Sequence, residues 1–358
     1  MPLRRIRITA LRCLEEVELN LHPQRNYIFG PNGAGKTSLL EGIFLLGRGR
    51  SFRTRQIRRL VRRGSEGFAV FGTVVRDDDV TQKLGVAYRS GHLEKKIDGN
   101  EAAGMAELAR VLPVHALDPS MHALVEGGPS ERRRFLDWGV FHVEQGYLES
   151  WKRYRRVLSH RNAALKRAAT DAELHPWSVA LAEAGEAVDG SRRRYLDLLA
   201  PSVADLGQRL LARPLTLRYR RGWTDEDGLE ATLSALRARD RENGNTEAGP
   251  HRAELVLLLD ERRAQDEASR GQQKLTAAAL VLAQVAVEST LHPGRSVVVI
   301  DDPAAELDGQ SLERLLETLG ELQAQLVLTA LAPEQLPQTP GHPVFHVEHG
   351  SVRTPASG

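Results

Sequence analysis

The sequence predicts an α/β fold in which an α-helical domain interrupts a strand-rich domain. Three observations support this class. A short apolar strand, a glycine-rich loop and a helix follow one another over residues 26–44. The rest of the first third and the last third contain short β-branched runs, whereas residues 130–211 carry apolar side chains at helical spacing. With 358 residues, the chain is long enough for two domains, or for one large domain with an insertion.

Short strands and one helix account for the first third. Each strand is marked by alternation of apolar and polar residues or by a brief apolar run. The helix is expected to start after Lys36 and to end near residues 47–49, and a hairpin is expected to turn at Asp77–Asp79. The strands expected here are 3–9, 17–21, 27–29, 67–75, 81–88 and, with its turn, 95–100.

The middle of the chain is predicted to be helical. Apolar and aromatic residues recur at helical spacing over Phe135–Leu165, and a second long helix is expected over Trp177–Leu199. Pro176 and Pro201 are expected to punctuate the helices, because proline lacks the amide hydrogen that a helix interior needs. The elements expected next are a strand at 215–219 and a helix at 229–241.

The last third returns to an α/β pattern. Residues 275–288 predict a nearly all-apolar, buried helix, and residues 297–300 a strand covered on both faces. The remaining expected elements are strands at 255–259 and 326–329, a helix at 312–323, a closing hairpin of 344–347 with 351–352, and a disordered tail at 354–358. The predicted domains are therefore a discontinuous strand-rich domain of residues 1–119 and 246–358, and a helical insertion of residues 120–245.

Composition indicates a globular protein in a reducing compartment. Hydrophobic residues make up 41% and charged residues 27% of the chain. The single cysteine, Cys13, excludes a disulfide framework and a cysteine zinc site. Residues 1–7 lack the apolar core of a signal peptide, and no stretch approaches the ~20 apolar residues of a membrane span. A cytoplasmic protein without membrane association is expected.

Positive charge is unevenly distributed, although the net charge is only +2. Eight arginines and no acidic residue lie between Arg48 and Arg63. Segregated charge of this kind favours contact with nucleic acid, and solvated helix faces are the alternative. Contacts with phosphates position a protein without reading sequence, so little base specificity is expected. The DNA contacts predicted are Arg55, Arg58, Arg59, Arg132, Arg133 and Arg134.

Residues 30–37 match the phosphate-binding loop pattern in its strand–loop–helix context. Glycines let the backbone turn with positive φ and approach phosphate closely, and the amides of a helix N-terminus attract anions. Lys36 can reach the β and γ phosphates, and the Thr37 hydroxyl can bind Mg²⁺. The residues predicted to hold the nucleotide are Gly30, Pro31, Asn32, Gly33, Ala34, Gly35, Lys36 and Thr37.

The apolar strand at 297–300 ends in two carboxylates. A strand tip beside a phosphate loop is where Mg²⁺ needs a carboxylate ligand, which is the role predicted for Asp301. Asp302, one residue on, is predicted to activate the attacking water as a general base. The alternative is that these acids cap the following helix, with Pro303 at an early helical position. The presence of the phosphate loop in the same chain favours the catalytic roles of Asp301 and Asp302 over helix capping.

A third segment, Ser269-Arg270-Gly271-Gln272-Gln273-Lys274, precedes the buried helix. A serine N-cap, a glycine with accessible backbone and a helix N-terminus make a second anion site. One chain has no obvious use for two such sites, but two chains do if each presents this segment to the γ phosphate held by the other. An ordinary capped helix is the alternative, and the order of motifs, ending in Glu306-Leu307-Asp308, favours the shared site.

This ordered set of motifs resembles ABC-type ATPases of the SMC-like DNA-repair branch, and more closely the bacterial RecF family. The segments that carry the resemblance run through most of the chain. They are Gly-Arg-Gly-Arg-Ser-Phe-Arg-Thr at 47–54, Gly-Gly-Pro-Ser-Glu-Arg-Arg-Arg-Phe-Leu-Asp-Trp at 127–138, Arg-Asn-Ala-Ala-Leu at 161–165, Gly-Pro-His-Arg-Ala-Glu-Leu at 249–255, Ser-Arg-Gly-Gln-Gln-Lys-Leu at 269–275 and Ile-Asp-Asp-Pro-Ala-Ala-Glu-Leu-Asp at 300–308.

The resemblance implies an ABC-type P-loop ATPase head, with a mixed central sheet and an antiparallel β subdomain, carrying an inserted helical lid. It implies that two heads dimerise on ATP and enclose two nucleotides. It also implies ATP-dependent binding to gapped, junction or single-stranded DNA, and slow ATP hydrolysis used as a timer. The implied partners are RecO and RecR, which would help load the RecA recombinase in gap repair, replication-fork maintenance and SOS induction.

Roles for single residues follow from the same resemblance. Lys36 and Asp302 would be catalytic, Thr37 and Asp301 would hold Mg²⁺, and Arg12 would lie near the adenine. The residues expected to act across the dimer, or in the loop that links its two sites, are Ser269, Gly271, Gln272 and Asp308.

Three positions depart from the family pattern, namely Cys13 in place of asparagine, Ala305 in place of serine, and Thr329 where transporters have a sensor histidine. Two other functions share the phosphate loop. The arginine run argues against a transporter ATPase subunit, in which it would have no role. The segment Ser269–Lys274 argues in the same way against a small-molecule kinase.

Overall fold

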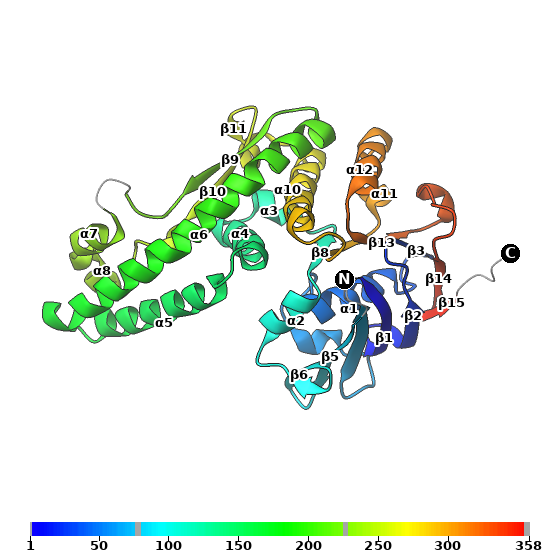
Figure 1. Ribbon diagram of the computed structural model, residues 1–358, viewed down its shortest axis with the longest axis horizontal. Coiled ribbons are helices and arrows are strands. Elements are labelled where there is room, and N and C mark those ends of the chain that lie inside the picture. Colours follow the sequence, from blue (N-terminus) through cyan, green and yellow to red (C-terminus); the bar gives the residue numbers. More distant parts are fainter. Residues whose placement is uncertain (1, 76–79, 225–227, 354–358) are drawn as a thin grey trace. The chain divides into compact units, whose positions relative to one another are not determined.

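The computed structural model describes residues 2–75, 80–224 and 228–353 (Figure 1). The chain divides into two compact units, one of residues 1–121 and 277–358 and the other of residues 122–276. Among the described residues, the first unit has two six-stranded sheets and the second has a three-stranded sheet with long helices. The predicted α/β class is confirmed. Residues 246–276, assigned above to the strand-rich domain, pack in the second unit, where β10 (Glu254–Leu259) pairs with β9 (Leu215–Arg220).

The first unit contains most of the predicted strands, in the predicted order. Its elements are β1 (Leu3–Leu11), β2 (Leu14–Asn20), β3 (Arg25–Phe29), α1 (Lys36–Arg48), β4 (Phe68–Val75), β5 (Thr81–Arg89), β6 (His92–Ile97), β7 (Asn100–Glu101), α2 (Met105–Val111), β8 (Val114–Leu117), β12 (Val297–Ile300), α11 (Pro303–Glu306), α12 (Gly309–Glu321), β13 (Gln325–Ala330), β14 (Val344–Glu348) and β15 (Ser351–Arg353).

One sheet of the first unit is mainly parallel and carries the phosphate loop. Its strand order is β15-β14-β3-β13-β12-β8, and only the β14–β15 pairing is antiparallel. The strand before the phosphate loop, β3, is therefore separated from β12 by β13 alone. Because parallel strands end at the same edge, the loop after β3 and the residues after β12 emerge side by side.

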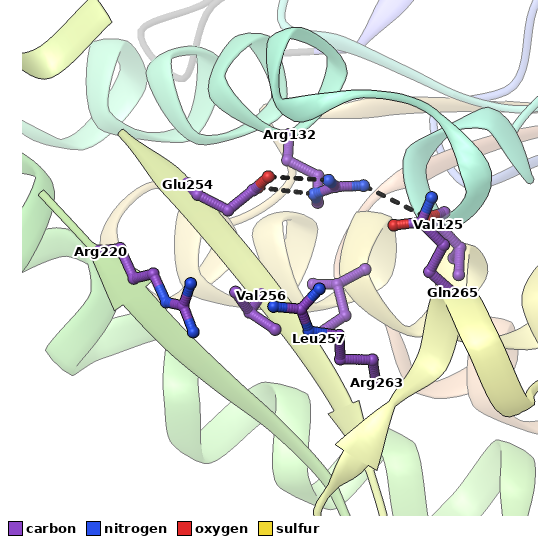
Figure 2. A pocket seen from close by; sticks show the side chains of 8 residues that line it. All are labelled: Val125, Arg132, Arg220, Glu254, Val256, Leu257, Arg263 and Gln265. Carbon is purple, nitrogen blue, oxygen red and sulfur yellow. Dashed lines mark hydrogen bonds and ion pairs between the residues drawn. The ribbon is translucent and has the colours of Figure 1, made fainter. Parts of the chain in front are cut away.

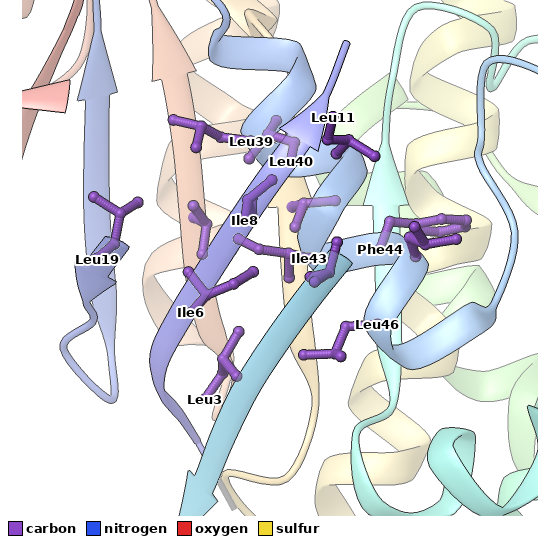
Figure 3. Packing of buried hydrophobic residues seen from close by; sticks show 14 of the residues in the cluster. Leu3, Ile6, Ile8, Leu11, Leu19, Leu39, Leu40, Ile43, Phe44 and Leu46 are labelled. Atoms are coloured by element: carbon purple, nitrogen blue, oxygen red, sulfur yellow. The ribbon is translucent and has the colours of Figure 1, made fainter. Parts of the chain in front are cut away.

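Helix α1 packs against the second, antiparallel sheet, whose order is β2-β1-β4-β5-β6-β7. Figure 3 shows Leu40 and Ile43 of α1 among the side chains of β1, including Ile6 and Ile8. These side chains are almost fully buried, and each stabilises the fold by roughly 1.5–3 kcal/mol. A Cβ on Gly42 would lie 2.5 Å from the Ile8 Cδ1 atom, so glycine lets the helix approach the sheet closely.

The second unit contains the helical part of the chain. Its elements are α3 (Ala123–Glu126), α4 (Pro129–Val143), α5 (Tyr147–Lys166), α6 (Asp171–Leu211), β9, α7 (Gly228–Ala235), α8 (Arg237–Asn243), β10, β11 (Arg262–Arg263), α9 (Ala264–Glu267) and the start of α10 (Arg270–Leu291). The helix predicted over 229–241 is two helices, α7 and α8, which meet at Leu236.

The prediction that prolines separate the helices is wrong for α6. This helix has 41 residues, and Pro176 and Pro201 both lie inside it. Each proline removes one helical hydrogen bond, at a cost of roughly 3 kcal/mol. Buried side chains on both sides of each proline, such as Leu174, Leu199 and Val203, hold the helix continuous.

Helix α10 corrects the expectation that no stretch approaches a membrane span. Within the described residues it is one helix whose length and composition would allow it to cross a membrane. Buried residues make up 72% of its apolar window, as expected of a core helix. Two other expectations, the turn at Asp77–Asp79 and the tail at 354–358, lie outside the described residues.

Candidate nucleotide site

The phosphate loop lies between β3 and α1, as predicted. Gly33 has φ of 77°, in the left-handed region that favours glycine. A Cβ on Gly30 would lie 2.1 Å from the Val347 carbonyl oxygen, so the loop can approach β14 only with glycine there. Lys36 Nζ donates hydrogen bonds to the carbonyl oxygens of Gly30 at 2.6 Å and Pro31 at 3.2 Å. These bonds hold the ammonium group within the loop.

Asp301 connects the end of β12 to the phosphate loop. The Thr37 hydroxyl lies 3.0 Å from each oxygen of the Asp301 carboxylate and donates to it. The Thr329 hydroxyl on β13 lies 3.1 Å from Asp301 Oδ1 and also donates. Burial raises the pKa of Asp301, with a smaller contribution from the neighbouring Asp302, while the two hydroxyls lower it. The strand order thus places together two residues that are 264 positions apart in the chain.

Asp302 has a backbone conformation that is unusual for a residue other than glycine. Its φ is 45° and its ψ is 60°, a left-handed conformation that aspartate tolerates better than most residues. Its backbone amide donates to the Thr329 hydroxyl at 3.0 Å. It precedes α11, yet its side chain makes no capping hydrogen bond, and within the described chain Oδ1 is buried without a hydrogen-bond partner. Capping does not account for this carboxylate.

A cavity of about 610 Å³ lies over the phosphate loop and both carboxylates. Four basic side chains, three arginines and Lys36, line it together with two aspartates and one glutamate. This arrangement suits an anionic polyphosphate. The lining residues are Arg12, Cys13, Pro31, Asn32, Gly33, Gly35, Lys36, Thr37, Ser38, Arg53, Arg59, Val61, Pro119, Asp301, Asp302, Ala305 and Glu306.

Arg12 is fixed at the wall of this cavity by a carboxylate that the sequence analysis did not identify. Its guanidinium forms two bonds with Glu41, at 2.8 and 2.9 Å, and donates to the Arg59 carbonyl oxygen at 3.0 Å. Glu41 is fully buried and also accepts a hydrogen bond from Ser51. Glu41 belongs to the apolar run of α1, and an acid at a buried helical position was the available signal.

The protein groups fit a magnesium site that the nucleotide completes. No group of three or more His, Cys, Asp or Glu side chains that could hold a metal occurs among residues 2–75, 80–224 and 228–353. Mg²⁺ commonly takes one or two protein ligands, and phosphate oxygens and waters supply the rest. The Thr37 hydroxyl and the Asp301 carboxylate are adjacent oxygen donors of the required kind.

Ser269 and Gly271 lie in the second unit, at the start of α10. The Ser269 amide donates to Gln272 Oε1 at 3.0 Å, and the Gln272 amide donates to Ser269 Oγ at 3.4 Å. The two bonds form a reciprocal cap, of which the sequence predicts the serine N-cap. Gly271 is exposed, and a Cβ there would meet nothing within 4 Å. Packing within the described chain therefore does not explain why glycine, rather than a residue with a side chain, occupies position 271.

Asp308 is the N-cap of α12. Its carboxylate accepts a hydrogen bond from the Ser311 amide at 3.0 Å and another from the Ser311 hydroxyl at 2.8 Å. These bonds lower the Asp308 pKa. The carboxylate therefore remains ionised and fixes the start of the helix.

The predicted DNA-contacting arginines differ in their surroundings. Arg132 is 6% exposed and pairs with both oxygens of Glu254, at 2.8 and 3.0 Å. Arg133 donates to the Ala253 carbonyl at 2.7 Å, and Arg134 pairs with Glu131. These partners explain the three arginines without DNA, so their placement does not favour the predicted contact.

The arginine run at 48–63 also serves more than one purpose. Arg59 lines the nucleotide cavity, and Arg53 lines it too, where its charge helps to lower the Asp301 pKa. Sequence analysis assigned Arg59 to DNA by name, and Arg53 only as a member of the arginine run expected to contact nucleic acid. Arg58 is exposed and, like Arg55, lies outside the cavity lining.

Comparisons with known proteins agree with this geometry. The family described as RecF/RecN/SMC N terminal domain matches residues 2–351. The DNA replication and repair protein RecF of Azotobacter vinelandii is 40% identical, and the match covers 98% of both chains. RecF of Chromohalobacter salexigens is 39% identical over 99% of this chain and 100% of its own.

Solved structures give the same result. The recombination mediator protein RecF with ATP, from the RecFOR pathway, has a TM-score of 0.88 and 26% identity, and the match covers 99% of this chain and 98% of that chain. An SMC head bound to the C-winged helix domain of ScpA has a TM-score of 0.59 and 14% identity, covering 99% and 97%, and shows the fold alone. The fold is that of an ABC-type ATPase head, and the chain belongs to the RecF family of DNA replication and repair proteins.

Proposed function

We propose that this protein is an ATP-switched DNA-binding protein of recombinational repair. One observation carries the nucleotide part of this proposal. The phosphate loop, Asp301 and Asp302, whose Oδ1 has no hydrogen-bond partner among the described residues, converge on one cavity at the edge of the parallel sheet. Family membership supports the repair role, because relatives are described as DNA replication and repair proteins and one neighbour as a recombination mediator with ATP.

The residues of the cavity have distinct roles in this proposal. The phosphate loop cradles the phosphates, and Lys36 exchanges its bonds to the loop carbonyls for the β and γ phosphates. Thr37 and Asp301 hold Mg²⁺, which neutralises charge on the phosphates when bound. Asp302 takes a proton from the attacking water. Arg12 borders the adenine side of the cavity, and Arg53 and Arg59 add positive charge.

ATP acts in this proposal by joining two copies of the chain. Ser269, Gly271 and Gln272 of one copy complete the γ-phosphate side of the other copy's site, and Asp308 belongs to the loop between the sites. Gly271 is exposed, and in the part of the chain that the structure describes no neighbouring atom requires glycine there, which supports this role. ATP then favours the dimer because it contacts both copies only in that state. Hydrolysis, for which Asp302 activates the water, removes the γ phosphate that joins the two copies. Its slow rate sets how long the dimer lasts.

The dimer would act on DNA at single-strand gaps and junctions in the cytoplasm. We propose that it helps load the RecA recombinase with RecO and RecR, and thereby supports fork maintenance and SOS induction. Exposed arginines of the 48–63 run, such as Arg55 and Arg58, are proposed to contact the DNA backbone. Membership of the RecF family favours this function over a transporter ATPase subunit or a small-molecule kinase.

Titration of labelled gapped DNA by fluorescence anisotropy, with ATP, with ADP and without nucleotide, tests the proposal. Tighter binding with ATP and a steep loss of affinity with salt are expected. Equal affinity in all three conditions would contradict the switch. No binding at modest salt would contradict the DNA-binding function itself and favour the transporter alternative.

A further inference from the structure

The three-stranded sheet of the second unit presents a face of arginines that sequence analysis did not single out. In the register of this sheet, Arg220 lies opposite Glu254, Arg218 opposite Val256 and Arg263 opposite Leu258. Alternate residues of a strand share a face, so these three arginines lie on the same face as Val256. All three are exposed. We call Arg218, Arg220 and Arg263 the sheet arginines.

A cavity of about 270 Å³ lies on this face and is lined by two of the sheet arginines. Figure 2 shows the guanidinium groups of Arg220 and Arg263 directed over Val256 from opposite sides. Glu254, the carboxylate in the lining, is already paired with Arg132 through two bonds. The positive charges of Arg220 and Arg263 are therefore not compensated within the cavity.

Neighbouring arginines of the same unit do have acidic partners. Arg262, next to Arg263 in β11, lies 3.5 Å from Glu267, and Arg213 lies 2.6 Å from Asp260. In the described part of the chain, by contrast, no carboxylate lies within ion-pair distance of a sheet arginine. Arg262 and Arg213 are thus paired with acids locally, whereas the sheet arginines, among the described residues, are not.

We propose that the sheet arginines bind phosphate groups of a DNA backbone. This inference rests on the proposed DNA-binding function and assigns a contact surface in the second unit, in place of Arg132–Arg134. Arg218 and Arg220 are two residues apart, roughly 7 Å along β9, and β11 lies two strand spacings away, roughly 10 Å. Positive charges separated by these distances can contact several phosphates of one chain at once, whereas a single carboxylate could contact only one of them. Arginine also binds phosphate with two parallel hydrogen bonds.

The test compares two double variants with the same change in net charge. Arg220→Gln with Arg263→Gln removes the cavity charges, whereas Arg213→Gln with Arg262→Gln removes two arginines that have acidic partners. Both are titrated with labelled gapped DNA in ATP over a series of salt concentrations. The first variant should bind DNA roughly tenfold more weakly, with a salt slope smaller by about 2, because each lost phosphate contact removes about 0.9. The control should bind as the original chain does.

Further measurements separate the possible failures. Arg220→Lys with Arg263→Lys should restore much of the salt slope, and nucleotide binding by all variants should be unchanged, which checks that they fold. If the original chain binds DNA and the glutamine variant binds equally well, the inference is overturned while the proposed function stands. Binding of the original chain and of the glutamine variant to a polyglutamate peptide is measured as well. If the glutamine variant loses binding to this peptide but keeps its affinity for DNA, the face binds acidic protein segments and the inference is also overturned. If the original chain binds no DNA, the proposed function fails and this inference with it.

Discussion

Replacement of Asp302 by asparagine separates ATP binding from hydrolysis. Asparagine has the same shape and also tolerates the left-handed conformation seen at this position, with φ of 45°. The backbone amide bond to Thr329 does not involve the side chain and is expected to persist. The variant therefore removes the charge and the proton acceptor, with little change in structure.

The size of the effect follows from the role of the lost group. A general base contributes roughly 10²–10⁴ in rate, or about 3–5 kcal/mol of the activation barrier. Because Oδ1 has no hydrogen-bond partner in the described chain, the carboxylate loses no stabilising bond on substitution. Removing its charge also lowers the Asp301 pKa, because Asp302 contributes to raising it. The substitution therefore favours the ionised form of Asp301, so binding of ATP with Mg²⁺ should be kept.

Single-turnover hydrolysis and titration with a fluorescent nucleotide measure the two effects separately. Hydrolysis by Asp302→Asn should fall roughly 10²–10⁴-fold, while nucleotide affinity stays within a factor of about three. Glu313→Gln, a change at an exposed carboxylate of α12, is the matched control and should leave both unchanged. Normal hydrolysis by Asp302→Asn would refute the assignment of the base.

Three further predictions concern the loop and the helical unit. Lys36→Met should weaken nucleotide binding roughly a hundredfold, since it removes a charged hydrogen bond to phosphate; unchanged affinity in the same titration would argue against the loop. Arg161 and Asp240 form a fully buried ion pair at 2.7 Å, so Arg161→Met should lower the free energy of unfolding by about 3–5 kcal/mol in a urea melt. A loss under about 1 kcal/mol would contradict this. Burial lowers the pKa of His251 from 6.5 to about 4, so the unfolded chain takes up a proton first as pH falls. The free energy of unfolding should therefore drop by up to about 3 kcal/mol between pH 6.5 and 4, and His251→Gln should flatten this slope; an equal slope would disprove the cause.

Local patterns were the most predictable part of the nucleotide site. The phosphate loop is contiguous, so its strand, glycines and helix are all visible in the sequence. The meeting of Thr37 with Asp301 agrees with the Mg²⁺ roles that the sequence predicts for both, since Asp301 directly follows β12 and Thr37 lies in the first turn of α1, after the loop that follows β3. The Ser269 cap is local for the same reason, since its partner is three residues away.

Contacts between distant residues could not be predicted in the same way. Arg132 belongs to a basic run in the sequence, but its partner Glu254 is 122 positions away and neutralises it. The sheet arginines show the opposite case, because Arg220 and Arg263 become neighbours only through the pairing of three strands. Basic residues that are close together in the sequence therefore need not form one exposed charged surface in the fold.

The continuity of α6 could not be predicted from local sequence rules either. Pro201 satisfies every local criterion for a break, yet α6 runs through it. Tertiary burial of Leu199 and Val203, both fully buried, outweighs the lost hydrogen bond. Such packing depends on helices whose positions the sequence does not give.

In the proposed function, ATP completes its own site by joining two copies of the chain. Light scattering of the protein with ATP, with ADP and without nucleotide tests it most directly, and Asp302→Asn can be used to prevent turnover. The expected mass is that of the 39.6 kDa chain without nucleotide and with ADP, and twice that value with ATP. Ser269→Arg should remain monomeric with ATP while still binding it. A monomer in ATP at every protein concentration, or a dimer that forms equally well without nucleotide, would contradict ATP-dependent dimerisation.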